Sequence, residues 1–481
     1  MGLSVEKSHG PDHFDVIVIG AGVSGINTAY RLQSELPDVT FAVLEGRDAI
    51  GGTWDLFKFP GVRSDSDMYS FGFAWNPWPY SQPVGKGHLI KEYLRSSIAK
   101  YQLDYHFHFK HKVVSMDWSS KAQQWDLTIN HNDIMKHYTA GTVILGTGYY
   151  DYENPRPSII PGLDDFKGKV IHPQFWPEDY DYTGKKMVIV GSGATAITLL
   201  PNLAKKAAKV TMVQRSPSYV ASLPNRKISW LSASYLRLWY IFYSYTGAML
   251  CLWFPNYMRK TFRKQTIKQL PDSVNVDLHF RPRYSPWEQR LCMSPDGDFF
   301  KAFHQPNTDI VTGIIKRVTE KTVEMENGQI IDADVIVTAT GLTMQFGGKI
   351  DIKVDGELVK WNEKFIWNGT MLQDIPNFFF IAGYARAAWT LGADSCAFII
   401  IRFLKLLSQQ QATVGTPRIP EAAKFPPHKY FPLSSTYSME AEARLPLYGN
   451  SGPWKRKRDS PPADLIHAHW GDITTDLQLS I

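Results

Sequence analysis

The chain has 481 residues, of which 44% are hydrophobic and 20% charged, a balance that predicts a folded protein of two or three domains. Its net charge of +6 is small for this length, and the one basic run, KRKR at 455–458, is interpreted as solvated surface. Nothing in these numbers supports a nucleic-acid-binding protein. Aromatic residues make up 13% of the chain, which favours an enzyme that lines its pockets with rings.

The three cysteines, Cys251, Cys292 and Cys396, lie far apart and form no CxxC pair. Their spacing excludes a zinc ribbon and the dithiol centre of a disulfide reductase, and it predicts a reducing compartment. The first thirteen residues are polar and lack the apolar core of a signal peptide. We therefore predict a cytoplasmic protein.

The first predicted element is a buried parallel strand at 14–19, which leads into a glycine-rich turn and a helix through Leu32. A second strand at 40–44 ends in Glu45, at the distance where an acid binds a ribose hydroxyl. Glycines in such a turn let a pyrophosphate approach the backbone at the helix N-terminus. This pattern predicts a dinucleotide-binding unit whose glycines are Gly20, Gly22 and Gly25.

The next segment, residues 51–67, reads GGTWDLFKFPGVRSDSD. Taken alone, Trp54 is typical of a core residue and Asp65 of a turn residue or helix cap. Further on, HKVVSMDW and QQWDLTIN within 106–130 alternate like paired strands, and a buried strand at 142–150 ends the first domain.

Three histidines in this region resemble a metal site by composition: His106, His108 and His111. The first two would share one strand face with no carboxylate in register. We interpret all three as surface residues and predict no metal site.

Residues 166–177, FKGKVIHPQFWP, are too polar for a core strand and too rich in proline for a helix, so they are interpreted as a linker that holds a shape. The fixed positions of this linker are Phe166, Gly168, His172, Trp176 and Pro177. They match one fingerprint of type I Baeyer–Villiger monooxygenases, flavoenzymes that insert oxygen next to a carbonyl. A second fingerprint of that family matches Gly51, Gly52, Trp54, Phe59, Pro60, Gly61 and Asp65.

The resemblance runs from about residue 14 to about 405 and is strongest to the ethionamide-activating subgroup. The segments that carry this finer resemblance are SDSDMY, HPQFWPEDYDY, GSGATAITLLP, LTMQFGG and AWTLGADS. The Pro-rich tail beyond indicates little.

A second strand–glycine–helix unit lies at 186–201, and its following strand ends in Arg215 where the first unit has Glu45. A carboxylate would repel a 2′-phosphate, whereas a guanidinium can bind it in bidentate fashion. Opposite charges at one position imply two different dinucleotides, and FAD with NADPH is the natural pair.

The resemblance places FAD in the first unit and NADPH in the second. The implied FAD-binding residues are Gly20, Gly22, Gly25, Glu45, Thr53, Trp54, Asp65 and Val113. The implied NADP-binding residues are Gly191, Ser192, Gly193, Thr195, Ala196, Gln214, Arg215 and Arg63.

The stretch 228–254 is the most apolar one, and two interpretations are open. It is too short for a membrane-spanning helix and is interrupted by Ser244, Thr246 and Gly247. The resemblance favours a pocket-lining helical pair over a substrate tunnel. The alternative is a shallow, peripheral contact with a membrane through aromatic residues.

Arg290 is the predicted catalytic residue, because in similar enzymes an arginine at this position contacts the nicotinamide and the peroxide beside the flavin. The resemblance implies that Asp65 orients it. Gln289 stands where many relatives have lysine, which removes one cation near the 2′-phosphate. His172 is predicted to act as a structural switch that holds the linker by a hydrogen bond when the nucleotide domain rotates.

The predicted fold is therefore α/β, with two Rossmann-like dinucleotide-binding domains and a helical insertion. Residues 1–150 form the first part of the FAD domain and 151–225 the first part of the NADPH domain. The insertion takes 226–284, after which 285–341 complete the NADPH domain and 342–481 the FAD domain with its tail.

The predicted function is Baeyer–Villiger oxidation of a hydrophobic ketone with NADPH and O₂, which the resemblance routes through a C4a-peroxyflavin. One alternative is an N- or S-oxygenating flavin monooxygenase acting on a thiocarbonyl or thioether. Another is a flavin reductase or oxidase that releases H₂O₂. An alternative of another class is a membrane-associated, non-catalytic flavin-fold protein. The sequence leaves the oligomeric state open.

Overall fold

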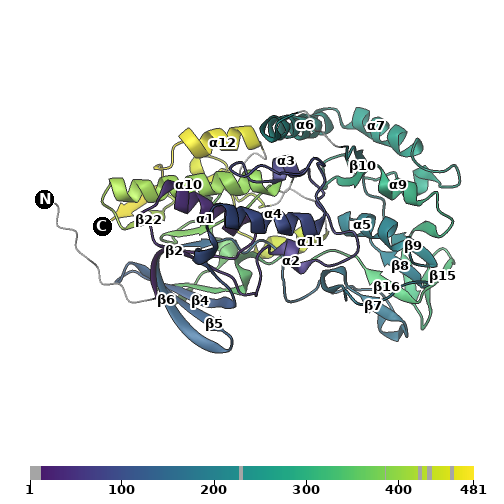
Figure 1. The fold of residues 1–481 in the computed structure, drawn as a ribbon, viewed down its shortest axis with the longest axis horizontal. Coiled ribbons are helices and arrows are strands. Elements are labelled where there is room, and N and C mark those ends of the chain that lie inside the picture. The colour runs from purple at the N-terminus through teal and green to yellow at the C-terminus, as the bar shows by residue number, and fades with distance from the viewer. Residues whose placement is uncertain (1–11, 227–230, 385, 421–424, 431–435, 456–459) are drawn as a thin grey trace.

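The computed structural model describes residues 12–226, 231–384, 386–420, 425–430, 436–455 and 460–481. Two sheets, each with helices packed on it, lie side by side, and a pair of helices runs along one edge of the molecule (Figure 1). The interpretation of 455–458 as solvated surface concerns residues that, apart from Lys455, lie outside the described ones.

The larger sheet has eleven strands and takes them from both halves of the chain. Its parallel centre is formed by β6, β1, β2 and β3, and an antiparallel arm continues from β6 through β5 and β4. The predicted paired strands are confirmed as β4 and β5. The strands are β1 (His13–Ile19), β2 (Phe41–Leu44), β3 (Phe107–His108), β4 (His111–Ser119), β5 (Gln124–His131), β6 (Ile134–Leu145), β17 (Asp351–Val354), β18 (Glu357–Leu358), β19 (Ile366–Trp367), β20 (Met371–Leu372) and β21 (Phe378–Phe380).

The smaller sheet is fully parallel, in the order β12-β9-β8-β16-β7. Its strands are β7 (Lys169–Ile171), β8 (Lys186–Val190), β9 (Lys209–Gln214), β12 (Thr308–Thr312) and β16 (Val335–Thr338). A three-stranded antiparallel sheet follows β12 and consists of β13 (Ile315–Val318), β14 (Thr322–Met325) and β15 (Ile330–Asp332). Two-stranded sheets are formed by β10 (Val220–Leu223) with β11 (Cys292–Pro295) and by β22 (Val414–Pro417) with β23 (Leu477–Ser480).

The helices on the larger sheet pack into the two cores that lie against it, α11 into one and the others into the other. They are α1 (Val23–Glu35), α2 (Thr53–Leu56), α3 (Met68–Phe71), α4 (Gly87–Lys100), α10 (Trp389–Gln409), α11 (Thr436–Ala441) and α12 (Pro461–Trp470). Helices α5 (Ala194–Leu203) and α9 (Asp298–Ala302) pack on the smaller sheet.

The apolar stretch 228–254 does not form the predicted helical pair. One continuous helix, α6 (Ala233–Trp253), covers its described part, and α7 (Pro255–Ile267) and α8 (Val276–His279) follow. Ser244, Thr246 and Gly247 interrupt the apolar run but do not end the helix, and the Thr246 hydroxyl donates to the Phe242 carbonyl 2.8 Å away in the preceding turn. Among the described residues, no helix has the length and apolar character needed to cross a bilayer.

Two smaller expectations are also corrected. The strand predicted at 142–150 ends at Leu145. Residues 166–177 contain the edge strand β7, which tolerates polar side chains because it buries only Ile171.

The three histidines predicted to be surface residues, His106, His108 and His111, are not all exposed. The His106 ring stacks on Phe41 at 3.6 Å between centroids, and His111 is buried. Burial lowers the pKa of His106, of His108 and of His111. Within the described ranges, no group of three or more acidic, histidine or cysteine side chains could hold a metal ion.

Candidate functional site

The first glycine turn leaves β1 at Gly20, whose φ of +106° suits glycine. A Cβ at Gly25 would lie 1.9 Å from the Gly20 carbonyl oxygen, so α1 packs on the strand only because position 25 has no side chain. At Gly22, by contrast, the nearest atom to such a Cβ is 3.8 Å away. Room for an anion therefore exists beside the N-terminus of α1.

Glu45 is buried at the end of β2 and accepts two backbone hydrogen bonds. Its Oε2 accepts the N–H of Ala21 at 2.8 Å, and its Oε1 accepts the N–H of Arg47 at 2.9 Å. The carboxylate thus fixes the glycine turn and the loop after β2 to one another. A carboxylate has about four acceptor positions, which leaves lone pairs for further donors.

The 51–67 segment folds against this turn. The Thr53 hydroxyl and the Tyr152 hydroxyl lie 2.9 Å apart, and burial raises the pKa of Tyr152 to about 12. The Trp54 ring meets Phe71 edge-on at 5.7 Å. Val113 is buried in β4. Tyr152 was not predicted, because no motif marks it in the sequence.

Asp65 and Arg290 meet although 225 residues separate them. The Arg290 Nη2 donates to the Asp65 Oδ1 at 2.7 Å. The side chains keep 29% (Asp65) and 37% (Arg290) of their surface exposed, so the pair is held but still accessible. The structure thus brings the two predicted catalytic residues together.

This pair lies in a cavity of about 970 Å³ between the two sheets, called the cleft here. The opposite wall carries the second glycine turn, and Gln289, Trp389 and the 338–342 strand end complete it. The predicted site residues that line the cleft are Asp65, His172, Gly191, Ser192, Gly193, Thr195, Arg215 and Arg290.

The second glycine turn is more open than the first. Gly191 has a φ of +141°, and a Cβ there would meet the Ala339 carbonyl oxygen at 2.2 Å. A Cβ at Gly193 would find no atom within 4 Å, so the N-terminus of α5 has free space beside it. The Ser192 hydroxyl lies 2.9 Å from that of Ser218 and fixes the turn to the loop after β9.

Two neighbouring residues of the second turn do not face the cleft. Ala196 is fully buried in the core between α5 and its sheet. Gln214 is also buried, and its amide donates to the His279 carbonyl at 2.8 Å and to the Thr312 hydroxyl at 2.9 Å. Arg215, the next residue, is exposed and lines the cleft. The side chains of Ala196 and Gln214 therefore do not line the cleft, and their contacts with NADP stay predictions.

Arg63 also differs from its predicted place. Its guanidinium pairs with Asp298 at the start of α9, with Nη2 3.1 Å from Oδ1, and only 11% of its side chain is exposed. Arg63 belongs to the segment that precedes α3, so the ion pair ties the 51–67 segment to α9 on the smaller sheet. The contact with NADP stays a prediction.

Close packing explains two positions of the linker, Gly168 and Trp176. A Cβ at Gly168 would lie 2.4 Å from the Asp334 carbonyl oxygen and 2.6 Å from the Phe166 ring. Trp176 is buried, with its ring edge-on to Tyr182, and leads into Pro177.

His172 caps a short 3₁₀ turn, since its Nδ1 accepts the N–H of Gln174 at 3.3 Å. Burial lowers the pKa of His172, while the backbone of Gly341 opposes that shift. The histidine therefore stands at the cleft wall, where the chain returns toward the larger sheet, and its role as a switch stays a prediction.

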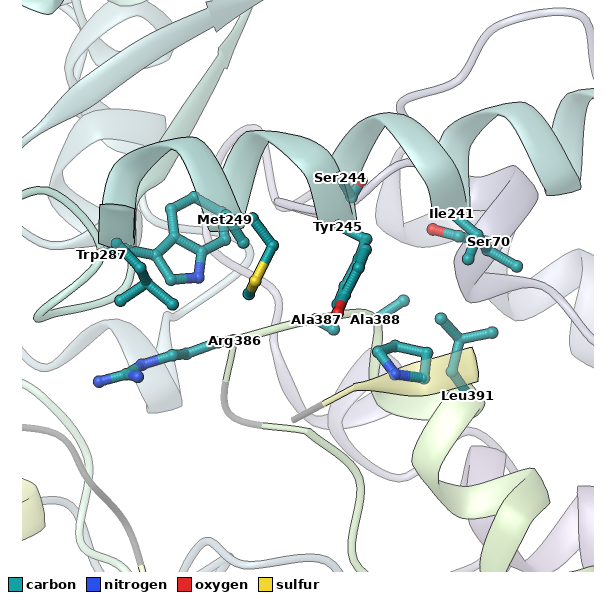
Figure 2. A pocket seen from close by; sticks show the side chains of 13 residues that line it. Ser70, Ile241, Ser244, Tyr245, Met249, Trp287, Arg386, Ala387, Ala388 and Leu391 are labelled. Atoms are coloured by element: carbon teal, nitrogen blue, oxygen red, sulfur yellow. The ribbon is translucent and has the colours of Figure 1, made fainter. Parts of the chain in front are cut away.

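A second cavity, of about 370 Å³, lies beneath α6 and is called the α6 cavity here. In Figure 2, Tyr245 and Met249 point from α6 into it, and Trp287, Arg386 and Leu391 approach from the other side. Two chain segments connect it to the cleft: Trp287 is three residues before Arg290, and Ala388 precedes Trp389. The predicted pocket-lining role of the insertion is thus confirmed for the inner face of α6.

Comparisons with known proteins agree with this geometry. The family model described as "Flavin-binding monooxygenase-like" matches residues 14–365. The chain is 40% identical over 460 residues to the FAD-containing monooxygenase EthA of Mycolicibacterium smegmatis, covering 93% of each chain.

Solved structures with this fold include the open form of cyclohexanone monooxygenase, with a TM-score of 0.77, 20% identity and coverage of 98% of this chain and 100% of that one. They also include OTEMO in complex with FAD and NADP, with a TM-score of 0.72, 22% identity and coverage of 85% and 87%.

These matches confirm the resemblance to the monooxygenase family, the α/β fold and the enzyme class predicted from the sequence. The predicted pair of FAD and a nicotinamide cofactor agrees with the names of these proteins. The chain belongs to the flavin-binding monooxygenase-like family.

Proposed function

We propose that this chain is a monooxygenase that uses FAD, NADPH and O₂ to convert a hydrophobic ketone into an ester or lactone. The observation that carries the proposal is the Arg290–Asp65 pair, which stands in one cleft with the second glycine turn and Arg215. In the overall reaction, one oxygen atom of O₂ enters the carbon–carbon bond beside the carbonyl. The other leaves as water, with NADPH as the source of two electrons.

The residues present fit both cofactors. The space at Gly22 and the spare acceptor positions of Glu45 suit the pyrophosphate and ribose of FAD. The space at Gly193 suits the pyrophosphate of NADPH, and the exposed Arg215 at the end of β9 suits its 2′-phosphate. When bound, FAD supplies the transfer of electrons from NADPH to O₂ and of oxygen to the substrate.

Arg290 acts by charge in this proposal. Oxygen insertion places negative charge on oxygen atoms in the cleft, and a guanidinium fixed beside them stabilises that charge. Asp65 holds the guanidinium at 2.7 Å, so Arg290 needs little reorganisation when the charge develops. Because arginine stays protonated at any physiological pH, the role is electrostatic rather than that of a general acid.

The α6 cavity is the proposed place for the substrate. Its lining mixes aliphatic and aromatic side chains with a few polar groups, which suits a ketone with an apolar body. The segments 287–290 and 386–389 lead from it to the cleft, so a carbonyl could reach Arg290 while the apolar part stays beneath α6.

Product analysis under ¹⁸O₂ tests the proposal. The FAD-loaded protein receives NADPH and a panel that contains an aliphatic ketone, an aryl ketone and a thioether. One labelled oxygen in an ester is the expected result. Label only in a sulfoxide would replace the proposal with an S-oxygenase, and NADPH consumption that yields only H₂O₂ across a wide ketone panel would replace it with an oxidase.

A further inference from the structure

The outer face of α6 is apolar and uncovered. Six large side chains on it are between 53% and 70% exposed: Tyr235, Leu238, Trp239, Phe242, Tyr243 and Trp253. Their spacing of three or four residues, or multiples of it, places them on one side of the helix. The opposite side is already used, because Leu236 and Tyr240 pack into the core and Tyr245 and Met249 face the α6 cavity.

This apolar strip continues beyond α6. Phe254 and Tyr257, at the start of α7, are 55% and 66% exposed. Figure 1 shows α6 and α7 along the same edge of the molecule. Single exposed apolar residues are ordinary, but a contiguous strip of this size marks an interaction surface.

The charges beside the strip have one sign. Residues 233–268 contain six lysines and arginines and no acidic residue. Arg237 turns inward to backbone carbonyls at 2.6–3.1 Å, and Arg263 pairs with Asp277. The remaining four cations, called the α7 cations here, are exposed on α7 or, for Lys268, directly after it: Arg259, Lys260, Lys264 and Lys268.

We propose that this α6–α7 face, made of the aromatic strip and the four α7 cations, binds flat to the surface of an anionic lipid bilayer. Tryptophan and tyrosine favour the headgroup region, and each nearby lysine or arginine adds attraction to anionic lipids. A second copy of this chain is a poorer occupant, because a symmetric contact would bring two sets of these cations together without an acid on either α6 or α7.

The two sides of α6 then have complementary tasks. The outer side binds lipid, and the inner side lines the cavity proposed above for the ketone. A lipophilic ketone dissolved in the bilayer would need to travel only past one helix. This last step rests on the proposed function, whereas membrane binding does not.

The test is flotation of the FAD-loaded protein with vesicles of phosphatidylcholine alone or mixed with phosphatidylglycerol. We expect binding only to the mixed vesicles, weakened by high salt as the screening length shrinks. Replacing Trp239→Ser, Phe242→Ser and Trp253→Ser together, or Lys260→Glu with Lys264→Glu, should reduce partitioning by about tenfold or more. None of these five residues lines the cleft or the α6 cavity.

Matched controls carry the same changes elsewhere on the surface: Ile134→Ser with Ile330→Ser and Leu358→Ser, and Lys121→Glu with Lys316→Glu. They should bind like the parent protein. Absence of vesicle binding, or equal loss in the controls, would overturn the proposal. So would an apolar-strip variant that turns a dimer into a monomer in sedimentation while vesicle binding is unchanged. Flotation requires no turnover, so it stays informative if ester formation fails.

Discussion

The two glycine turns of this chain have the same strand–turn–helix order but differ in the residue that follows the second strand of each unit. In the first, the residue at the end of the second strand is Glu45, which is buried and already bound to two backbone N–H groups. In the second, the residue at that position is Arg215, which is exposed at the wall of the cleft. The first turn is thus tied by a buried carboxylate, whereas the second is tied by the Ser192–Ser218 hydroxyl pair and has its charged residue at the cleft.

This difference predicts that the two turns bind their cofactors in different ways. A turn that its own carboxylate orders before binding loses little entropy on binding, which suits a cofactor that stays bound. An exposed arginine at the wall of the cleft can add charge-assisted hydrogen bonds to an arriving phosphate, which suits a cofactor that binds and dissociates. We therefore predict that the choice of dinucleotide at each turn depends on this one side chain rather than on the shared backbone.

Alanine at one glycine of each turn gives the largest contrast. Gly25→Ala should destabilise the protein by about 3 kcal/mol or abolish folding, because its Cβ would sit 1.9 Å from a carbonyl oxygen. The Cβ added by Gly193→Ala would have no atom within 4 Å. This substitution should change the free energy of unfolding by less than about 0.5 kcal/mol. Thermal unfolding with and without added FAD measures both, and equal effects would contradict the packing described here.

Removing Arg290, the cation between the two turns, should have the second-largest effect, which is on ester formation. Arg290→Ala should keep FAD binding and flavin reduction by NADPH but lower ester formation about 10²–10³-fold, as expected for a lost transition-state charge. Arg290→Lys, which keeps a charge without the planar fork, should lie between the two. Stopped-flow reduction and product yield separate the steps, and normal ester yield from Arg290→Ala would remove the assignment.

The charge difference between the turns can itself be tested. Arg215→Ala should raise the KM for NADPH about tenfold or more, since charge-assisted bonds to a phosphate contribute about 1.5–3 kcal/mol. The KM for NADH should stay nearly constant, which serves as the internal control. If both constants rise together, the 2′-phosphate is recognised by another residue.

The smallest expected effect concerns pH. Burial lowers the pKa of His172, so on acidification the unfolded chain takes up a proton before the folded one does. The stability that this histidine contributes is complete above its ordinary pKa of 6.5 and is lost as the pH falls below it. His172→Gln should flatten the pH dependence of denaturant unfolding between about pH 5 and about pH 7, by at most about 1.4 kcal/mol per pH unit. The exposed His137→Gln is the control and should keep the parent slope.

Both strand–turn–helix units could be predicted because their signals are local. The apolar run, the glycines and the residue after the second strand lie within about thirty residues and depend on backbone geometry that only glycine permits. The Asp65–Arg290 pair was different, since no local rule joins residues 225 positions apart. Only the resemblance brought them together in advance.

Side-chain direction was the main thing that the sequence left undetermined. Gln214 and Arg215 are adjacent, yet one is buried against Thr312 and the other lines the cleft, because β9 ends at Gln214 and Arg215 lies in the loop that follows. Arg63 pairs with Asp298, a partner that no motif indicates.

The inward-pointing Arg237 limits how the α6 cavity can open. Its guanidinium donates to the carbonyls of Tyr69, Ser70 and Gly72, where the short helix α3 ends, and the Thr390 hydroxyl at the start of α10 donates to the Phe71 carbonyl at 2.6 Å. Lifting α6 alone would strip a nearly buried cation of three acceptors at once, a cost of several kcal/mol. Helix α6 is therefore held in place above the cavity. A substrate has to enter beside α6 or after a movement of the smaller sheet.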